Sequence, residues 1–139
     1  MLPVTEAFKK AYEDNDFECE VFESETGDQV QVLVNSEVFG PRYLLVNFPN
    51  KGGYVSAMLP FLEIPKGKSH VAVTVANDLQ RGSHLVKFWA DKKKRTVWAV
   101  ATSLVQEADA VAMTNDTIMF LMNYCNRVFE QYEMSLGIG

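Results

Sequence analysis

The middle of the chain carries the pattern that most restricts the fold, a helix followed by a β-hairpin. Apolar residues recur at three- and four-residue spacing over Ser69–Arg81, which predicts one buried stripe on a helix. Gly82 is expected to end this helix in a left-handed conformation. The segments His84–Asp91 and Thr96–Val105 then predict two strands, and only Lys92–Arg95 lies between them. A connection this short makes the two strands antiparallel neighbours.

The residues before this unit predict a short helix and more sheet. Thr5 is expected to cap a helix that runs to about Asn15. Apolar and polar residues then alternate, as they do in half-buried strands. Glu25–Asp28 predicts a hairpin turn in which Gly27 supplies a positive φ. Three or four strands are expected in this part, over residues 17–24, 29–34, 42–48 and 54–60.

The last predicted element is a long helix, from a cap at Thr114 to about Leu136. Met119 and Phe120 fall outside its apolar stripe, so its first turns are apolar nearly all round. Such a helix is covered on more than one side, and the sheet supplies only one cover. The other could be a loop, a second subunit or a client peptide. The stripe itself consists of Ile118, Leu121, Met122, Cys125, Val128, Phe129, Tyr132 and Leu136.

These elements define the fold class. A helix, three or four antiparallel strands, a second helix, a β-hairpin and a long C-terminal helix make an α+β domain, with helices packed on a twisted sheet. The 139 residues are most simply one domain, residues 1–139. With 47% hydrophobic residues, a chain of this length can bury a real core.

Charge and cysteine content narrow the partners and the compartment. A net charge of −5 argues against nucleic acid or an anionic membrane as a partner. Neither a signal-peptide pattern nor an apolar run of membrane-spanning length is present, so no membrane association is expected. Cys19 and Cys125 lie in apolar patterns and predict buried free thiols in a reducing cytoplasm.

Histidine and cysteine chemistry offers no site. His70 and His84 are far apart in sequence with no cysteine near either, whereas zinc ligands commonly come in close pairs. Cys125 lies in the middle of the apolar stripe, where burial would leave its thiol inert. We therefore predict no metal, no cofactor and no enzyme activity.

Two other polar features have simple explanations. The pair Glu18 and Glu20 and the pair Glu107 and Asp109 could in principle serve proton transfer. A chain with 18 acidic residues, however, produces such pairs without any pocket. The basic run Lys92–Arg95 is either a phosphate-binding tip or a solvated hairpin tip, and the second interpretation suits an acidic chain better.

Alternation along the hairpin separates the two tryptophans. Leu85 and Trp89 share a face that is otherwise polar, whereas Trp98 is assigned to the core. A large aromatic residue on a wet face is a favoured interface anchor. The sequence therefore predicts a protein interface at Trp89 and Leu85, with Met119 and Phe120 of the last helix as its second part.

The order of elements, at this length and acidity, resembles the type III secretion chaperone-like fold. The segments Ala76–Arg81 and Val86–Asp91, with the hairpin return from Thr96, are similar to the bacterial sensory transduction regulator family called YbjN-like. An acidic loop at Gln106–Asp109 and the last amphipathic helix occupy the places that follow in that family. Relatives commonly have a second Asn where this chain has Gln80.

The resemblance implies a small, non-enzymatic bacterial protein of the cytoplasm, a homodimer that holds other proteins or acts in stress and regulatory responses. Our leading hypothesis is a chaperone-like protein-binding module whose partners are a second copy and a client or regulatory protein. Two alternatives stay open. One is a regulatory domain that binds a small ligand between the sheet and the last helix, and the other is an enzyme with an unrecognised site.

Overall fold

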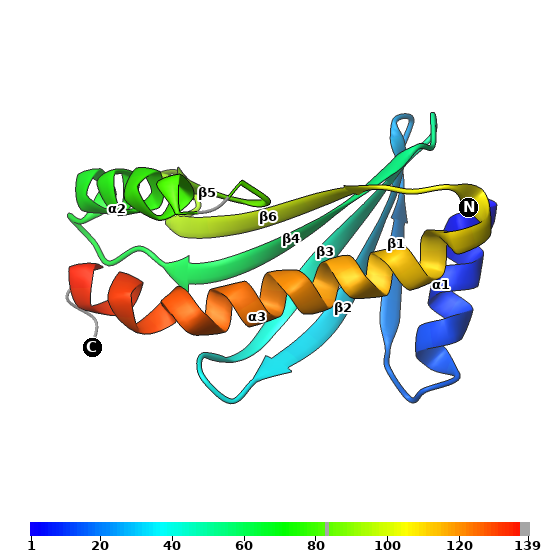
Figure 1. Ribbon diagram of the computed structural model, residues 1–139, viewed down its shortest axis with the longest axis horizontal. Helices are drawn as coiled ribbons and strands as arrows, with labels where there is room; N and C mark the ends of the chain where they lie inside the picture. Colours follow the sequence, from blue (N-terminus) through cyan, green and yellow to red (C-terminus); the bar gives the residue numbers. More distant parts are fainter. Residues whose placement is uncertain (83, 137–139) are drawn as a thin grey trace.

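The computed structural model describes residues 1–82 and 84–136. The elements follow one another as helix, four strands, helix, two strands and helix, and Figure 1 colours them along the chain. The predicted order is confirmed, with four strands before the second helix. Their bounds are α1 (Pro3–Glu13), β1 (Cys19–Glu23), β2 (Gly27–Ser36), β3 (Gly40–Pro49), β4 (Tyr54–Glu63), α2 (Ser69–Arg81), β5 (Val86–Asp91), β6 (Thr96–Leu104), a 3-10 turn η1 (Glu107–Asp109) and α3 (Ala110–Leu136).

The strands form one antiparallel sheet in the order β1-β2-β3-β4-β6-β5. The first four strands are a meander of consecutive neighbours. The chain then passes through α2, places β5 at the far edge, and returns with β6 between β5 and β4. The strands fan out strongly, and α3 crosses them from the α1 end to the α2 end of the molecule (Figure 1). The fold class is α+β, as predicted.

The helices pack on one face of this sheet through aromatic side chains. Phe8 of α1 meets Phe48 of β3 edge-on, with ring centroids 5.5 Å apart. Phe61 of β4 contacts Phe129 and Tyr132 of α3, at centroid distances of 5.9 and 5.8 Å. Side chains on this face of the strands are buried and those on the other face are not, as the alternation in sequence predicts. Each large apolar side chain buried in this way contributes about 1.5–3 kcal/mol to folding.

The sequence pattern located α2 correctly at Ser69–Arg81. The hydroxyl of Tyr132 on α3 donates a buried hydrogen bond of 2.9 Å to the carbonyl of Ala72, which holds α2 against α3. Gly82 follows the helix, but its φ is −83°, so the predicted left-handed end is wrong. The Gly82 amide instead closes a tight last turn on the carbonyl of Leu79, at 3.1 Å.

Two threonines predicted as helix caps lie inside helices. α1 begins at Pro3, which suits a first turn. Thr5 is buried, and its hydroxyl donates to Asp28 of β2 at 2.6 Å. α3 begins at Ala110, and the hydroxyl of Thr114 donates back to the Ala110 carbonyl at 2.6 Å. A threonine that bonds within or beside its own helix therefore gives the same sequence signal as a cap.

The remaining predictions about structure hold in part. Cys125 is buried and Cys19 is half-buried, and both thiols are free. The observed strands differ from the predicted ones by a few residues, except that β4 continues to Glu63 past an irregularity between Pro60 and Leu62. No described helix is both long enough and apolar enough to cross a bilayer.

Candidate functional site

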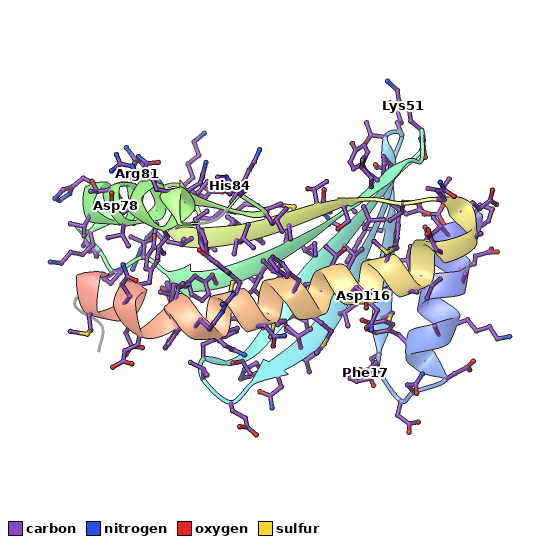
Figure 2. All side chains as sticks on the ribbon, in the orientation of Figure 1. Phe17, Lys51, Asp78, Arg81, His84 and Asp116 are labelled. Carbon is purple, nitrogen blue, oxygen red and sulfur yellow. The ribbon has the colours of Figure 1, made fainter. Side chains whose placement is uncertain are left out.

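A groove of about 880 Å³ lies between α3 on one side and α1 with β2 on the other. Val32 and Ile118 contribute to its apolar lining, and Tyr12 and Phe17 line it on the α1 side. Figure 2 labels Phe17 just beyond the end of α1. The polar groups of the lining are mainly carboxamides, from Asn15, Asn35, Asn115, Asn123 and Asn126.

The wall of the groove on α3 is a second helical stripe beside the one that faces the sheet. Its members recur at three- and four-residue spacing, which places them on one side of the helix. Met119 lies in this stripe and is 52% exposed. The first turns of α3 therefore have one side packed on the sheet and a second side that faces the groove. Within the described residues this second side is not covered. The stripe runs through Ala112, Asn115, Met119, Asn123 and Asn126.

Two hydrogen bonds fix the asparagines of the groove. The hydroxyl of Tyr12 donates to Oδ1 of Asn115 at 3.1 Å, which joins α1 to α3. The hydroxyl of Ser36, at the end of β2, donates to Oδ1 of Asn126 at 2.6 Å. Both amides use their oxygen in these bonds, so each keeps an NH₂ group that can donate to something in the groove.

Acidic side chains lie in the lining of the groove and next to it in the chain. Asp109 is its single charged lining residue. The turn after α1 adds Asp14, Asp16 and Glu18, all exposed, on either side of Asn15 and Phe17. Asp109 accepts a hydrogen bond from the amide of Gln106 at 3.0 Å, so part of its role is to begin the helix. An occupant of this groove would therefore meet apolar and amide surface with negative charge at its edge.

The groove contains no pair of groups suited to acid–base chemistry among its described lining. Burial, and to a smaller extent the neighbouring Cys19, raise the pKa of Tyr12 to about 12. The phenol therefore stays protonated at neutral pH and acts as a hydrogen-bond donor. Asp109 is exposed and lies on the opposite wall, at the start of α3.

The sheet has a second surface, the face turned away from the helices, which we call the bare face. On the four central strands it presents residues 29–35 of β2, 41–49 of β3, 54–60 of β4 and 98–104 of β6, taking every second position. None of these outward residues is charged. The hydrogen bonds on this face join neutral side chains, Gln29 to Asn47 at 2.9 Å and Ser56 to Thr102 at 2.9 Å.

The two tryptophans lie together on this bare face. Trp89 of β5 is directly opposite Trp98 of β6, and their rings stack at 6.1 Å with an angle of 18° between planes. Trp98 is half-buried and outside the core, so its predicted core position is wrong. Its indole Nε1 is the one buried side-chain nitrogen or oxygen of the described residues that has no hydrogen-bond partner.

The residues predicted as one interface lie on three surfaces. Trp89, 43% exposed, is on the bare face. Met119 lines the groove, on the opposite side of the sheet. Leu85 and Phe120 line a smaller pocket of about 280 Å³ between α3 and the last residues of β6, beside Thr117. All four side chains are exposed, as expected, but the structure brings together only Leu85 and Phe120.

The other sequence candidates do not converge. His70 on α2 and His84 in the connection before β5 are both exposed, and Figure 2 labels His84 beside α2. In the described ranges, no three His, Cys, Asp or Glu side chains are grouped so that they could hold a metal ion. Cys125 is fully buried, and burial raises the pKa of its thiol, which makes it a poor nucleophile.

The asparagines of the groove were not predicted from the sequence. The walls of the groove come from residues as distant as Tyr12 and Asn126, so only the tertiary fold brings them together. The available signal was the second stripe on the last helix, at three- and four-residue spacing. Comparison with known proteins adds nothing to this site, because no family model and no curated protein matches the chain.

Proposed function

We propose that this chain is a non-enzymatic, chaperone-like module that holds a short cationic and apolar segment of another protein in the groove between α1 and α3. The observation that carries the proposal is an open groove with an apolar lining, a set of carboxamides and an acidic edge. Its size is within the range of ligand-binding clefts. The site lies at Met119, one of the residues expected to contact a client.

The lining suits a peptide in an extended conformation. Apolar side chains of the segment would pack on Met119 and Ile118. A carboxamide offers both a donor and an acceptor, so Asn123 matches the N–H and C=O groups of a peptide backbone. The free NH₂ group of Asn115 would donate to a carbonyl of the segment in the same way.

The charge of the groove favours a cationic partner. Asp109 in the lining and Asp14, Asp16 and Glu18 beside it would attract lysine or arginine side chains. The chain as a whole carries a net charge of −5, which acts in the same direction and speeds encounter with a basic segment. Binding should therefore weaken as the salt concentration rises.

The wider assignment is part of the same proposal. Its support is the order of elements, with a long last helix across the sheet. We propose that this fold is the type III secretion chaperone-like one and that the chain is a YbjN-like protein of the bacterial cytoplasm, acting in stress or regulatory responses.

Fluorescence anisotropy with labelled synthetic peptides tests the groove. The probe is a short peptide of alternating Leu and Lys, and its counterpart has Glu in place of Lys. We expect the Lys peptide to bind and Met119→Lys to weaken that binding by at least about tenfold, or 1.4 kcal/mol. Met134→Lys is the matched control, because it adds the same charge at another exposed methionine of α3, outside the groove. Equal loss in both variants, or equal binding of the Glu peptide, would contradict the proposal.

A small-ligand regulator is the second candidate, and one observation favours it. The groove volume of about 880 Å³ also falls within the range for small-molecule sites. A thermal-shift screen of small amphipathic cations separates the two ideas. The ligand-binding regulator would be favoured if a compound raises the melting temperature, Met119→Lys abolishes this rise, and no peptide binds.

A further inference from the structure

We infer that two copies of this chain pack their bare faces together, around a two-fold axis parallel to the strands. Most of the groove lining lies on the helix side of the sheet, and the two surfaces share only Leu33 and Asn35 near the end of β2. The inference can be tested independently of the proposed function, because neither Met58 nor Lys87 lines the groove.

The first argument is the absence of charge from the four central strands of the bare face. The chain carries 31 charged residues, from 13 Lys and Arg and 18 Asp and Glu. None of them points outward from the central strands over residues 29–35, 41–49, 54–60 and 98–104. Exposed faces of acidic proteins are normally charged, whereas the centres of protein interfaces are depleted in charge and rich in aromatic residues and methionine. This face presents Trp98, Met58 and Tyr43.

The second argument is a row of side chains that crosses the whole sheet. Strand register places Glu20, Gln31, Leu45, Met58, Val100 and Lys87 side by side, one from each strand. The row begins with an acid on the edge strand β1 and ends with a base on the edge strand β5. Its two middle members, Leu45 and Met58, are apolar.

A two-fold axis parallel to the strands uses both ends of this row. The rotation reverses the order of strands, so β1 of one copy lies over β5 of the other. Glu20 then faces Lys87 of the second copy and Leu45 faces Met58. Each of these contacts occurs twice, because a two-fold interface is self-complementary. An axis perpendicular to the strands would instead place Glu20 over Glu20 and Lys87 over Lys87. The charges therefore select one orientation.

The neighbouring row fits the same orientation. Two residues along each strand from the first row lie Leu33, Tyr43, Pro60 and Trp98. The rotation places Trp98 of each copy over Leu33 of the other, so this row adds two apolar contacts. On the other side of the first row the face is hollowed over Gln29 and Asn47, a cavity of about 560 Å³ with a polar floor. Interfaces commonly keep water in such places.

The available area is of the right size for a stable dimer. Strands about 4.8 Å apart and rising about 3.3 Å per residue give the six-stranded face a flat area of roughly 29 by 20 Å, or about 600 Å². The pleated side chains add to this flat area, and a standard interface uses about 800 Å² of accessible surface on each partner. In the described residues no helix stands on this face that could block the approach.

Sedimentation equilibrium over a range from about 1 to about 100 μM tests the inference at the affinity of ordinary dimers. We expect wild-type protein to approach twice the monomer mass of 15.7 kDa. Met58→Glu should leave a monomer throughout this range, because it places an unpaired charge at the centre of the interface. Val38→Glu is the matched control, an exposed apolar residue in the turn before β3, and should dimerise like wild type.

A charge exchange tests the orientation. Lys87→Glu should raise the dissociation constant by about tenfold or more, since both of its pairs become repulsive. Glu20→Lys combined with Lys87→Glu should restore dimerisation, because the exchange recreates both pairs. Circular dichroism and thermal unfolding of each variant identify any that fails to fold, and Leu45→Lys then replaces Met58→Glu at the centre. A monomeric wild type, a dimer that tolerates a central charge, or a double variant no better than Lys87→Glu would overturn the inference.

Discussion

The carboxylate of Asp28 is expected to anchor α1 to the sheet, and Asp28→Asn is the perturbation that tests this. Asp28 is buried, and its Oδ2 accepts hydrogen bonds from the Leu2 amide at 2.7 Å and from the Thr5 hydroxyl at 2.6 Å. These bonds hold the first turn of α1 against β2. Because α1 forms one wall of the groove, the same anchor positions Tyr12 there.

The size of the effect follows from the two bonds. Hydrogen bonds to a charged acceptor contribute about 1.5–3 kcal/mol each, and neutral ones about 1 kcal/mol. Asparagine can place its carboxamide oxygen where Oδ2 lies and accept both bonds in neutral form. We therefore expect Asp28→Asn to lower the free energy of unfolding by about 2 kcal/mol at neutral pH, and Asp28→Ala, which removes the acceptor, by about 4 kcal/mol.

The pH dependence gives a sharper test. Burial by itself would raise the pKa of Asp28, but the hydrogen bonds from Thr5 and Leu2 outweigh it and hold the pKa below its usual value. A depressed folded-state pKa stabilises the fold fully above the unfolded pKa of about 3.9, and that contribution is lost as the pH falls through the folded pKa. The stability difference between wild type and Asp28→Asn should therefore shrink below about pH 4.

Urea denaturation followed by tryptophan fluorescence measures these differences at neutral and acidic pH. Asp116→Asn is the control, an exposed carboxylate on α3 without a hydrogen bond to any described residue, and it should change the unfolding free energy by less than about 0.5 kcal/mol. The reasoning is refuted if Asp28→Asn costs no more than Asp116→Asn, or if its cost is the same on both sides of pH 4.

Two further predictions concern the backbone and a thiol. Gly27→Ala should lower the unfolding free energy by about 3 kcal/mol or more, since a Cβ at φ +152° would meet the β3 backbone, including Pro49 Cα at 2.8 Å. Gly52→Ala, at φ +69° with open space around it, should cost only about 1–2 kcal/mol, and urea denaturation compares the two. The Cys125 thiol is buried, and this burial raises its pKa, so it should react with a thiol reagent only as fast as the protein unfolds. Stopped-flow absorbance in a Cys19→Ala background measures this rate. Prompt labelling of the folded protein would contradict the prediction.

Periodicity in sequence predicted elements whose structure depends on near neighbours. α2 occupies Ser69–Arg81, as its apolar stripe indicates, and the strand alternation identifies the residues that face the core. The predicted start of α3 is wrong because Thr114 has the side chain of a typical helix cap. The capping pair is Gln106 and Asp109, which begin η1 one turn before α3. Thr114 and the pair Gln106 and Asp109 can all cap a helix by their side-chain chemistry. Only the backbone conformation in the folded chain shows which of them does so.

The position of Trp98 could have been derived from the hairpin. A four-residue tip between Asp91 and Thr96 pairs these two residues, and counting back places Trp89 opposite Trp98 on one face. Alternation gives β6 two largely apolar sets, one with Trp98 and one with Val97, and the strand by itself does not show that the set with Val97 faces the helices. The groove could not have been derived in this way, because its walls join residues from opposite ends of the chain, such as Tyr12 and Asn126.

The placement of β6 between β4 and β5 has a consequence for folding. The first four strands pair with sequence neighbours, so each hairpin closes only a short loop. β6 must pair with β4 across the whole segment 64–95, which includes α2 and β5. Closing a long loop costs more chain entropy than closing a hairpin and slows the step that needs it. The meander is therefore expected to form first, with the edge of β4 open to other strands until Thr96 and the residues after it arrive to cover it.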